Sequence, residues 1–358
     1  MKPIIVQHTA GHAGHGGPAT ALHRLITSDL AGKYSLVVMR QEHAAGGFDI
    51  ALIKRWVAQL RRIRPDMVHV RGMGNEGFHA ALAARIARCP RILVSVHGSV
   101  RELTGERTWR RRVVGSVLEP LTLTWATHVA TVCRSATDSA LVKRAADKLV
   151  GVVPNGVPHH AQDPAARDRT RAQLQIASDR IVLVVVSRLS TEKGHLVLAD
   201  ALDLLDARGL HCDLLVVGGG PDRAVIARRY RAVRGSRVHL VGQSDDVFGY
   251  LGASDIFVFP TLHENLSNAL IEAMSAGLPA VATAVGGNVE VLEAGGGLLV
   301  APGDPVALCD ALQRLITSGP ADREELGRAA RTAASERFSA EAMISGWDRV
   351  YTRILAGG

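Results

Sequence analysis

Short apolar runs alternate with helical segments along almost the whole chain, and this alternation constrains the fold more than any other feature. The runs that fit buried strands are residues 3–8, 34–39, 66–70, 91–96, 128–132, 149–153, 180–186, 211–217, 238–241, 255–259, 280–283 and 297–300. Continuous apolar runs of this length indicate strands that are covered on both faces. Because the segments between them carry helical patterns, we predict an α/β fold built from doubly wound parallel sheets.

The series is interrupted once, at Val153-Pro-Asn-Gly-Val-Pro158, and a polar stretch follows as far as Ser178. Proline, asparagine and glycine clustered in this way mark a loop, so we interpret the segment as an interdomain linker. A chain of 358 residues is comfortable for two domains. We therefore expect one domain over residues 1–160 and a second over residues 161–339.

The most informative stretch joins a strand to a helix between residues 255 and 279. Pro260 stops the strand, a polar turn follows, and helical spacing begins at about Leu266. Free N–H groups at a helix N-terminus bind phosphate, and a carboxylate can hold sugar hydroxyls. Glu264 on the turn and Glu272 in the helix therefore indicate a nucleotide-sugar site.

A hydrolytic pair is the alternative for these two carboxylates. If both lay on one helix, the rise per residue would place their Cα atoms ~12 Å apart, beyond the spacing of glycosidase pairs. Both would also approach from the same domain rather than flank a bond. Binding of sugar and ribose hydroxyls suits them better.

Two cations follow the first strand of the second series, Arg188 and Lys193. A guanidinium fork and a compact ammonium group together suit a diphosphate, whereas two exposed loop cations are the ordinary alternative. Gly218-Gly-Gly-Pro221 follows the next strand. Its glycines would let the backbone approach a ligand, but a tight turn requires them as well.

The loop after the first strand contains a formal dinucleotide fingerprint, Gly14-x-Gly16-x-x-Ala19. Its first glycine does not follow the strand directly, and no acidic residue ends the second strand, which closes with Arg40. An NAD(P)-dependent enzyme therefore remains a minor alternative. We expect the loop instead to fold over a ligand.

Histidines occur in this loop and at one later strand end. For His8, His12 and His15 we expect a solvated loop rather than a metal site, since no helix brings them together. His97 ends a buried strand and precedes Gly98, so we expect it to face a ligand, with a structural histidine as the alternative.

Composition limits the other classes of function. No run approaches the ~20 apolar residues of a membrane helix, and the N-terminus lacks a signal-peptide pattern. The four cysteines are far apart in sequence, which suits buried thiols in a reducing, cytoplasmic setting. The net charge is +8, but the chain has no nucleic-acid motif.

Basic residues gather between Arg101 and Arg112, around Trp109. A solvated helix face is the ordinary explanation of such a run. The alternative is an interfacial helix that binds anionic lipid, which would place the protein at the inner face of the membrane. The neighbouring Val113 and Val117 could pack against the core in either case.

Taken in order, these motifs resemble those of the retaining GT-B glycosyltransferases of family 4. The resemblance covers almost the whole chain. It rests on Gly16-Gly17, His97-Gly98, Val153-Pro-Asn-Gly156, Ser187-Arg-Leu, Glu192-Lys-Gly194, Gly218-Gly-Gly-Pro221, Glu264 and Glu272 with seven residues between them, Ala276-Gly-Leu-Pro279 and Gly286-Gly287. It implies two Rossmann-like domains facing a central cleft, with the helix of residues 340–358 packing back on the first domain.

The resemblance also implies roles for individual residues in the second domain. Arg188 and Lys193 would neutralise the donor diphosphate, and Glu272 would hold the ribose hydroxyls. The remaining donor-binding positions would be Gly220, Gln243, Glu264, Asn265, Leu266 and Ser267.

In the first domain, Gly16 and Gly17 would reach the diphosphate or the acceptor, and His97 would touch the sugar near the reacting centre. His97, Arg188, Lys193 and Glu264 would then be the catalytic residues. Two motifs depart from the family pattern. The usual Glu-Gly-Phe-Gly is Glu264-Asn-Leu-Ser267, and a frequent His-x-His is His69-Val-Arg71, so the sugar and any acceptor role of that position do not carry over.

The predicted reaction moves a sugar from a nucleoside-diphosphate α-sugar to an acceptor hydroxyl with retention of configuration. We expect no metal, because no Asp-x-Asp lies at a strand end, and no cofactor beyond the co-substrate. The acceptor would be a sugar, a glycolipid or a natural product. A nucleotide-sugar epimerase of the same fold is a further alternative.

Overall fold

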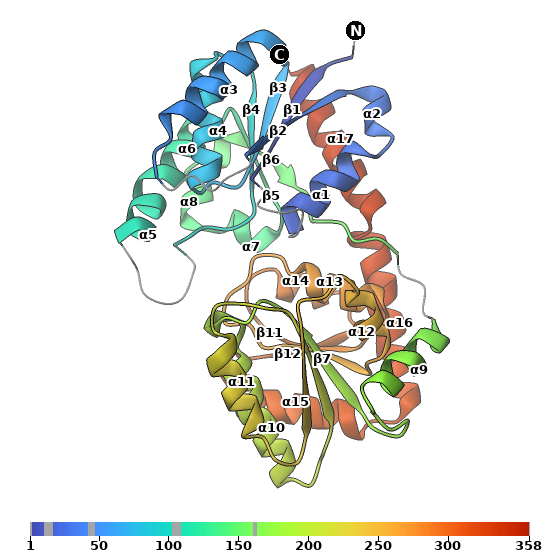
Figure 1. The fold of residues 1–358 in the computed structure, drawn as a ribbon. Coiled ribbons are helices and arrows are strands. Elements are labelled where there is room, and N and C mark those ends of the chain that lie inside the picture. Colours follow the sequence, from blue (N-terminus) through green and yellow to red (C-terminus); the bar gives the residue numbers. More distant parts are fainter. Residues whose placement is uncertain (1, 11–16, 42–46, 102–108, 160–162, 358) are drawn as a thin grey trace. The chain divides into compact units, whose positions relative to one another are not determined.

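The computed structural model describes residues 2–10, 17–41, 47–101, 109–159 and 163–357, and the chain forms two compact units. The first unit is Met1–Gly156 with Ala340–Gly358, and the second is Val157–Ser339. Each contains one six-stranded parallel sheet in its described part. The parallel sheets and the helices between their strands confirm the predicted α/β class (Figure 1).

The first sheet has the strand order β2-β1-β3-β4-β5-β6. Its strands are β1 Ile4–Ala10, β2 Ser35–Gln41, β3 Met67–Arg71, β4 Ile92–Val96, β5 His128–Thr131 and β6 Leu149–Val152. The α-helices of this unit are α1 Gly17–Ile26, α2 Leu30–Lys33, α3 Ile50–Ile63, α4 Asn75–Ile86, α5 Trp109–Val113, α6 Glu119–Trp125, α7 Arg134–Thr137, α8 Ala140–Lys143 and α17 Ala340–Ala356. A π-helical turn, η1 Val114–Leu118, joins α5 to α6, and a 3-10 turn, η2 Ala146–Lys148, precedes β6.

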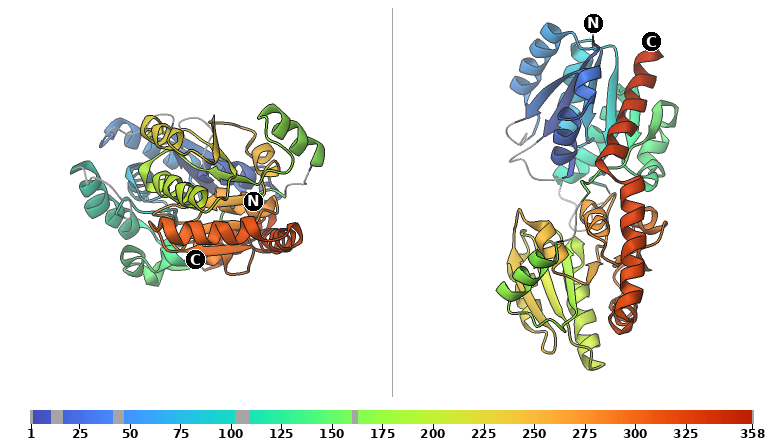
Figure 2. Two further views of the ribbon diagram at one scale, coloured as in Figure 1. Left: turned by 90° about the horizontal axis from the view of Figure 1, so that it is seen from below. Right: turned by 90° about the vertical axis from the view of Figure 1, so that its right-hand side faces the viewer.

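The side chains of these strands alternate between two cores, as the two-residue period of a strand requires. Val6, Val68 and Val94 pack with residues of α3, α4 and α6. Ile5, Met67 and Leu93 pack on the other face, with residues of α1 and α17. The final helix α17 therefore belongs to the hydrophobic core of the first unit and lies along its sheet (Figure 2).

The second sheet has the order β12-β11-β10-β7-β8-β9. Its strands are β7 Val182–Val186, β8 Asp213–Val217, β9 Arg237–Gly242, β10 Ile256–Phe259, β11 Ala280–Thr283 and β12 Gly297–Val300. Its helices are α9 Pro164–Gln173, the 3-10 turn η3 Thr191–Lys193, α10 His195–Ala207, α11 Arg223–Arg231, α12 Val247–Gly252, α13 Asn268–Ser275, α14 Asn288–Leu292, α15 Pro305–Thr317 and α16 Pro320–Arg337. Helices α10, α11 and α15 contribute to one core with Leu183, Leu214 and Val258.

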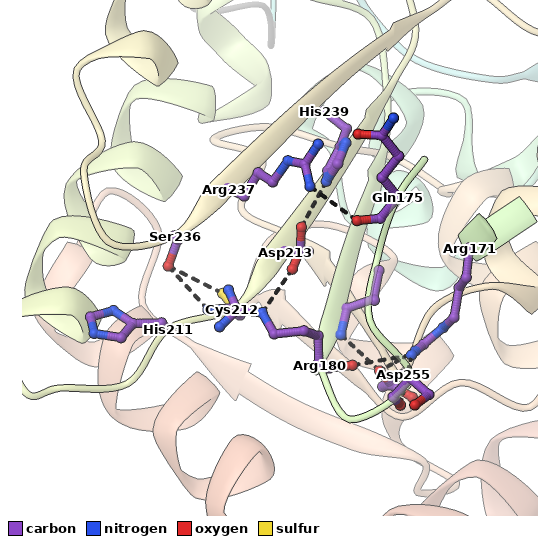
Figure 3. A network of polar contacts seen from close by, with 12 residues as sticks. Arg171, Gln175, Arg180, His211, Cys212, Asp213, Ser236, Arg237, His239 and Asp255 are labelled. Carbon is purple, nitrogen blue, oxygen red and sulfur yellow. Dashed lines mark hydrogen bonds and ion pairs between the residues drawn. The ribbon is translucent and has the colours of Figure 1, made fainter. Parts of the chain in front are cut away.

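The polar stretch interpreted as a linker contains a helix, α9, and this corrects the prediction. Arg167 and Arg171 of α9 form ion pairs with Asp255, at 2.6 and 2.8 Å. The guanidinium of Arg171 also donates to the backbone carbonyls of residues 178, 180 and 253 (Figure 3). A helix held mainly by charge-assisted hydrogen bonds needs few apolar residues. The apolar pattern of α9 was therefore too weak to predict a helix.

The segment between β5 and β6 forms two short helices and a turn, α7, α8 and η2, rather than one continuous helix. The Ser139 hydroxyl accepts a hydrogen bond from the Val142 N–H and so caps α8. Serine offers the backbone this local alternative to a continuous helix.

Candidate functional site

Two neighbouring strands of the second sheet, β7 and β10, mark its topological switch point. The chain runs from β7 to β8 and β9 on one side, and returns to β10, β11 and β12 on the other. Phe257 of β10 pairs with Val184 of β7. Open parallel sheets bind ligands outside the carboxyl ends of the strands at such a point. Among the predicted donor residues, Arg188 and Lys193 follow β7, and residues 264–267 follow β10.

An ion pair joins the two turns. The Lys193 ammonium donates to Glu264 Oε2 at 2.8 Å, and both side chains are less than one fifth exposed. The same ammonium lies 5.7 Å from the Phe259 ring centroid, within reach of a cation–π interaction. Backbone contacts hold the turns together, since the Leu262 N–H donates to the Glu192 carbonyl at 2.8 Å. The structure therefore brings Lys193 and Glu264 together across 71 residues of sequence.

Arg188 occupies a different environment from Lys193. Its guanidinium donates to Glu192 Oε1 at 2.7 Å, and its side chain is 60% exposed. Each of the two predicted diphosphate cations therefore has a carboxylate partner in the absence of ligand. Glu192 was not among the predicted site residues, although its spacing of four from Arg188 was a visible signal.

Gly194 allows the two turns to approach each other. Its φ is +72°, and a Cβ built on it would lie 1.9 Å from the Pro260 carbonyl oxygen. A side chain at this position would push the turn that carries Lys193 away from β10. The predicted donor residue Gly220 has a similar role, because its Cβ would lie 2.3 Å from the Leu189 carbonyl oxygen.

A buried histidine that the sequence analysis missed supports the turn after β7. The ring nitrogens of His195 form hydrogen bonds with the Ser187 hydroxyl and the Tyr230 hydroxyl, both at 3.0 Å. Burial lowers the pKa of His195 to about 4; the Arg188 carbonyl opposes this shift and the Lys193 charge adds to it. His195 is therefore neutral at pH 7 and positions the turn.

The segment from Glu264 to α13 differs in one respect from the prediction. The helix begins at Asn268 rather than at about Leu266, because Ser267 has extended backbone angles and its hydroxyl accepts from the Leu270 N–H. Ser267 and Leu266 are buried. The Asn265 carbonyl accepts from the Gly287 N–H at 2.6 Å, which ties this segment to the turn before α14.

The remaining donor-binding candidates lie near these turns or outside the described part of the chain. Glu272 lies in the second turn of α13 and is partly exposed. Gln243 follows β9, is exposed, and its side chain is 3.9 Å from the Cβ position of Gly219. In the first unit, Gly17 begins α1, whereas Gly16 lies outside the described residues.

His97 lies in the first unit, at the carboxyl end of β4. Its Nε2 forms a hydrogen bond with the Ser95 hydroxyl at 3.1 Å, and Ser95 in turn contacts His69 at 3.0 Å. Burial, followed by the charge of Arg71, lowers the pKa of His97 to about 3. The ring is therefore neutral at pH 7. That His97 touches a transferred sugar remains a prediction.

His8 corrects the expectation of a solvated loop. It lies within β1, is completely buried, and packs edge-on against Trp56 with ring centroids 5.5 Å apart. The strand extends two residues beyond the predicted end. His12 and His15 lie outside the described residues.

Val113 and Val117 do not pack on the core as predicted, since they are 42% and 47% exposed. Trp109 is 70% exposed, and the Arg110 guanidinium lies 5.6 Å from its ring centroid. Arg107 lies outside the described residues. Apolar and basic side chains therefore share one exposed segment over α5 and η1.

The described residues contain no group of three or more His, Cys, Asp or Glu side chains that could hold a metal ion. No helix among them is long and apolar enough to cross a membrane.

The sequence of this chain is similar to known protein families and to known relatives. A family profile described as "Glycosyl transferases group 1" matches residues 180–318, and one described as "Glycosyltransferase Family 4" matches residues 29–161. The 2-deoxystreptamine glucosyltransferase of Streptomyces kanamyceticus is 30% identical over 302 residues, which is 81% of this chain and 76% of that protein.

A second relative is named as an enzyme that acts on a lipid-linked sugar. The UDP-Gal:alpha-D-GlcNAc-diphosphoundecaprenol alpha-1,3-galactosyltransferase of Escherichia coli is 28% identical over 236 residues. The match covers 64% of this chain and 60% of that relative, so the chain spans less than two thirds of its length. Among solved structures, Alr3699/HepE of Anabaena in complex with UDP and glucose has a TM-score of 0.77 at 17% identity. That match covers 97% of this chain and 99% of the other.

Proposed function

The chain belongs to glycosyltransferase family 4, and we propose that it transfers a sugar from a nucleoside-diphosphate sugar with retention of anomeric configuration and without a metal ion. Its two units of parallel sheet have the GT-B fold. The observation that carries the proposal is the Lys193–Glu264 ion pair at the switch point of the second sheet. A cation and a carboxylate fixed there suit a diphosphate and a sugar hydroxyl, respectively.

Negative charge grows on the leaving diphosphate as the glycosidic bond to the donor breaks. Lys193 is half-buried and fixed by Glu264, so it is already in place to stabilise that charge. Arg188 is exposed and would exchange Glu192 for a phosphate oxygen. Backbone N–H groups at the start of α13 would add a third source of positive potential. We assign no general base, since a leaving oxygen on the same face could take the acceptor proton.

Relatives support a nucleotide-sugar donor. The Escherichia coli relative is named for a UDP-galactose donor, and the Anabaena structure holds UDP and glucose. We propose that Glu272 contacts the ribose, that Gln243 lies towards the base, and that Gly220, Asn265, Leu266 and Ser267 line the donor. The acceptor would present a free hydroxyl on a sugar, a glycolipid or a natural product.

Thermal-shift screening of the full chain against UDP-, GDP-, ADP- and TDP-sugars tests the donor class. A cognate donor at 100 times its Kd adds ~2.7 kcal/mol to the unfolding free energy, whereas the others add little. Product analysis by NMR with candidate acceptors then gives the anomeric configuration. A chain that no nucleotide sugar stabilises, or a product of inverted configuration, would contradict the proposal.

We also propose that the segment around Trp109 contacts anionic lipid. Exposed Trp109, Val113 and Val117 beside Arg110 and Arg112 combine apolar and basic groups on one surface, as interfacial helices do. Flotation with anionic and neutral vesicles measures this contact. Equal recovery on both kinds of vesicle, or no loss of binding in W109A, would contradict it.

A further inference from the structure

One buried cation of the first unit has no counter-charge among the described residues. Arg71 is the last residue of β3 and is 8% exposed. Its Nη1 donates to the His8 carbonyl at 3.3 Å, and the Tyr351 hydroxyl is its other polar neighbour. Among the described residues it forms no ion pair with a carboxylate. A guanidinium carries five N–H donors, so most of its hydrogen-bonding capacity is unused.

The groups around Arg71 do not compensate its charge. His8, His69 and His97 all lie close enough to feel it, and its charge helps to lower the pKa of each of them after burial. Neutral imidazoles do not balance the positive charge of the guanidinium. A buried charge without an opposite charge is costly, because burial removes its hydration.

Arg171 shows how this chain satisfies a buried arginine that has a structural role. It is 5% exposed, pairs with Asp255 at 2.8 Å, and donates to three backbone carbonyls (Figure 3). Arg171 therefore has a counter-charge and, counting it, four hydrogen-bond acceptors. Within the described residues, Arg71 has no counter-charge and fewer acceptors.

The chain is uncrowded at the residue that follows Arg71. A Cβ built on Gly72 would meet no atom within 4 Å. His97, at the carboxyl end of the neighbouring strand β4, is partly exposed. His8 is completely buried, and neither of its ring nitrogens has a hydrogen-bond partner in the described part of the chain.

We propose that Arg71 is the anchoring cation of an anion-binding site in the first unit, which takes a phosphate or carboxylate group carried by the acceptor. The inference rests on the proposed glycosyltransferase function and names a class of acceptor for it. A guanidinium fork matches both groups, and a bound anion would supply the missing charge. The acceptor is then an anionic molecule rather than a neutral sugar.

Inorganic phosphate is the probe, titrated into the full chain at constant ionic strength with sodium chloride as balance. Wild type and R188A/K193A should both gain melting temperature with phosphate, because the second variant lacks only the donor cations. Introduced into R188A/K193A, R71Q should weaken this response by at least tenfold in apparent Kd, on the scale of one charged hydrogen bond. R62Q removes an exposed charge from the same unit and should behave as wild type.

Two further measurements distinguish an anion-binding role of Arg71 from a structural role. Without phosphate, R71Q should melt no lower than wild type, since it removes an uncompensated buried charge. If R71Q fails to fold, R71K carries the test, and its phosphate Kd should rise about tenfold because the fork is lost. Unchanged phosphate affinity in the folded R71 variant, or a response lost in R188A/K193A instead, would overturn the site.

The donor screen is run on the same proteins, so that the two proposals can fail separately. If nucleotide sugars bind and phosphate does not depend on Arg71, the inference fails and the proposed function stands. If phosphate depends on Arg71 and no nucleotide sugar binds, the anion site stands and the proposed function fails.

Discussion

At the scale of the residue, the site depends on a few side chains whose partners lie far along the chain. Lys193 has its carboxylate partner 71 residues away, whereas the partner of Arg188 is one helical turn away. Lys193 is therefore fixed by the tertiary structure and Arg188 by a local contact. Half-buried ion pairs hold their geometry better than exposed pairs do, so the two cations differ in preorganisation.

Replacing either predicted diphosphate cation should slow transfer. Lys193→Ala and Arg188→Ala should each lose at least about 2.7 kcal/mol of transition-state stabilisation, which is the scale of one oxyanion-hole donor. The measurement is kcat/KM with the donor that the screen identifies. R228A, at an arginine in the last turn of α11, is the control. Turnover within threefold of wild type for both variants would refute the phosphate assignment.

Gly194 should tolerate no side chain. Gly194→Ala should destabilise the protein by well over 1 kcal/mol, because a positive φ and a clash with the Pro260 carbonyl both penalise the Cβ. Gly209 is the matched control, since its φ is +75° but its Cβ would meet nothing within 4 Å. Urea denaturation compares the two variants. Equal losses would show that the close approach of the two turns is unimportant.

At the scale of the element, helix α9 shows how a polar segment can be integrated into a unit. Its Arg171 is almost completely buried against Asp255, which also accepts the Val182 N–H at the start of β7. The helix is thus tied to the amino-terminal edge of the sheet, opposite the edge that carries Lys193. That arrangement gives α9 a structural role.

Breaking this contact should destabilise the second unit. Arg171→Ala should cost about 3–5 kcal/mol, because it leaves Asp255 without its buried partner. Arg169 lies on the same helix, and its pair with Asp163 is mostly exposed, so Arg169→Ala should cost less than about 1 kcal/mol. Chemical denaturation measures both losses. A small loss for Arg171→Ala would mean that Arg167 alone is sufficient to hold Asp255.

At the scale of the whole molecule, buried neutral histidines should control the response to mild acid. Burial lowers the pKa of His8 to about 3 and that of His195 to about 4, against about 6.5 for an unfolded chain. As pH falls, the unfolded chain takes up these protons first. Stability is therefore complete above about pH 6.5 and is lost as pH falls towards the folded values.

Each such histidine should lower the unfolding free energy by about 1.4 kcal/mol per pH unit in this window. Urea denaturation at pH 7, 6 and 5 measures the slope. H8F keeps the edge-on packing against Trp56 and removes no hydrogen bond within the described residues. It should therefore reduce the slope of the unfolding free energy against pH by the contribution of about one proton. A stability that is constant from pH 7 to pH 5 would contradict the buried state of these rings.

Most strands and long helices could be predicted from the sequence, because short apolar runs alternate with helical patterns and glycine and proline mark the turns between them. Helices α3 and α15 follow from the sequence, because apolar spacing and an aspartate N-cap are local signals. Helix α9 was missed because its stability comes from Asp255, 84 residues from Arg171. His195 was missed because its burial and its partner Tyr230 are tertiary facts.

The sequence by itself determined the fold class, the family and the turns that carry the candidate donor residues, since these follow from periodicity and short motifs. The tertiary structure alone decided that Lys193 meets Glu264 and that Gly194 must lack a side chain. It also left Arg71 buried without a carboxylate in the described chain. Charge compensation between residues far apart in the chain depends on which side chains meet in space, and local sequence patterns carry no information about that.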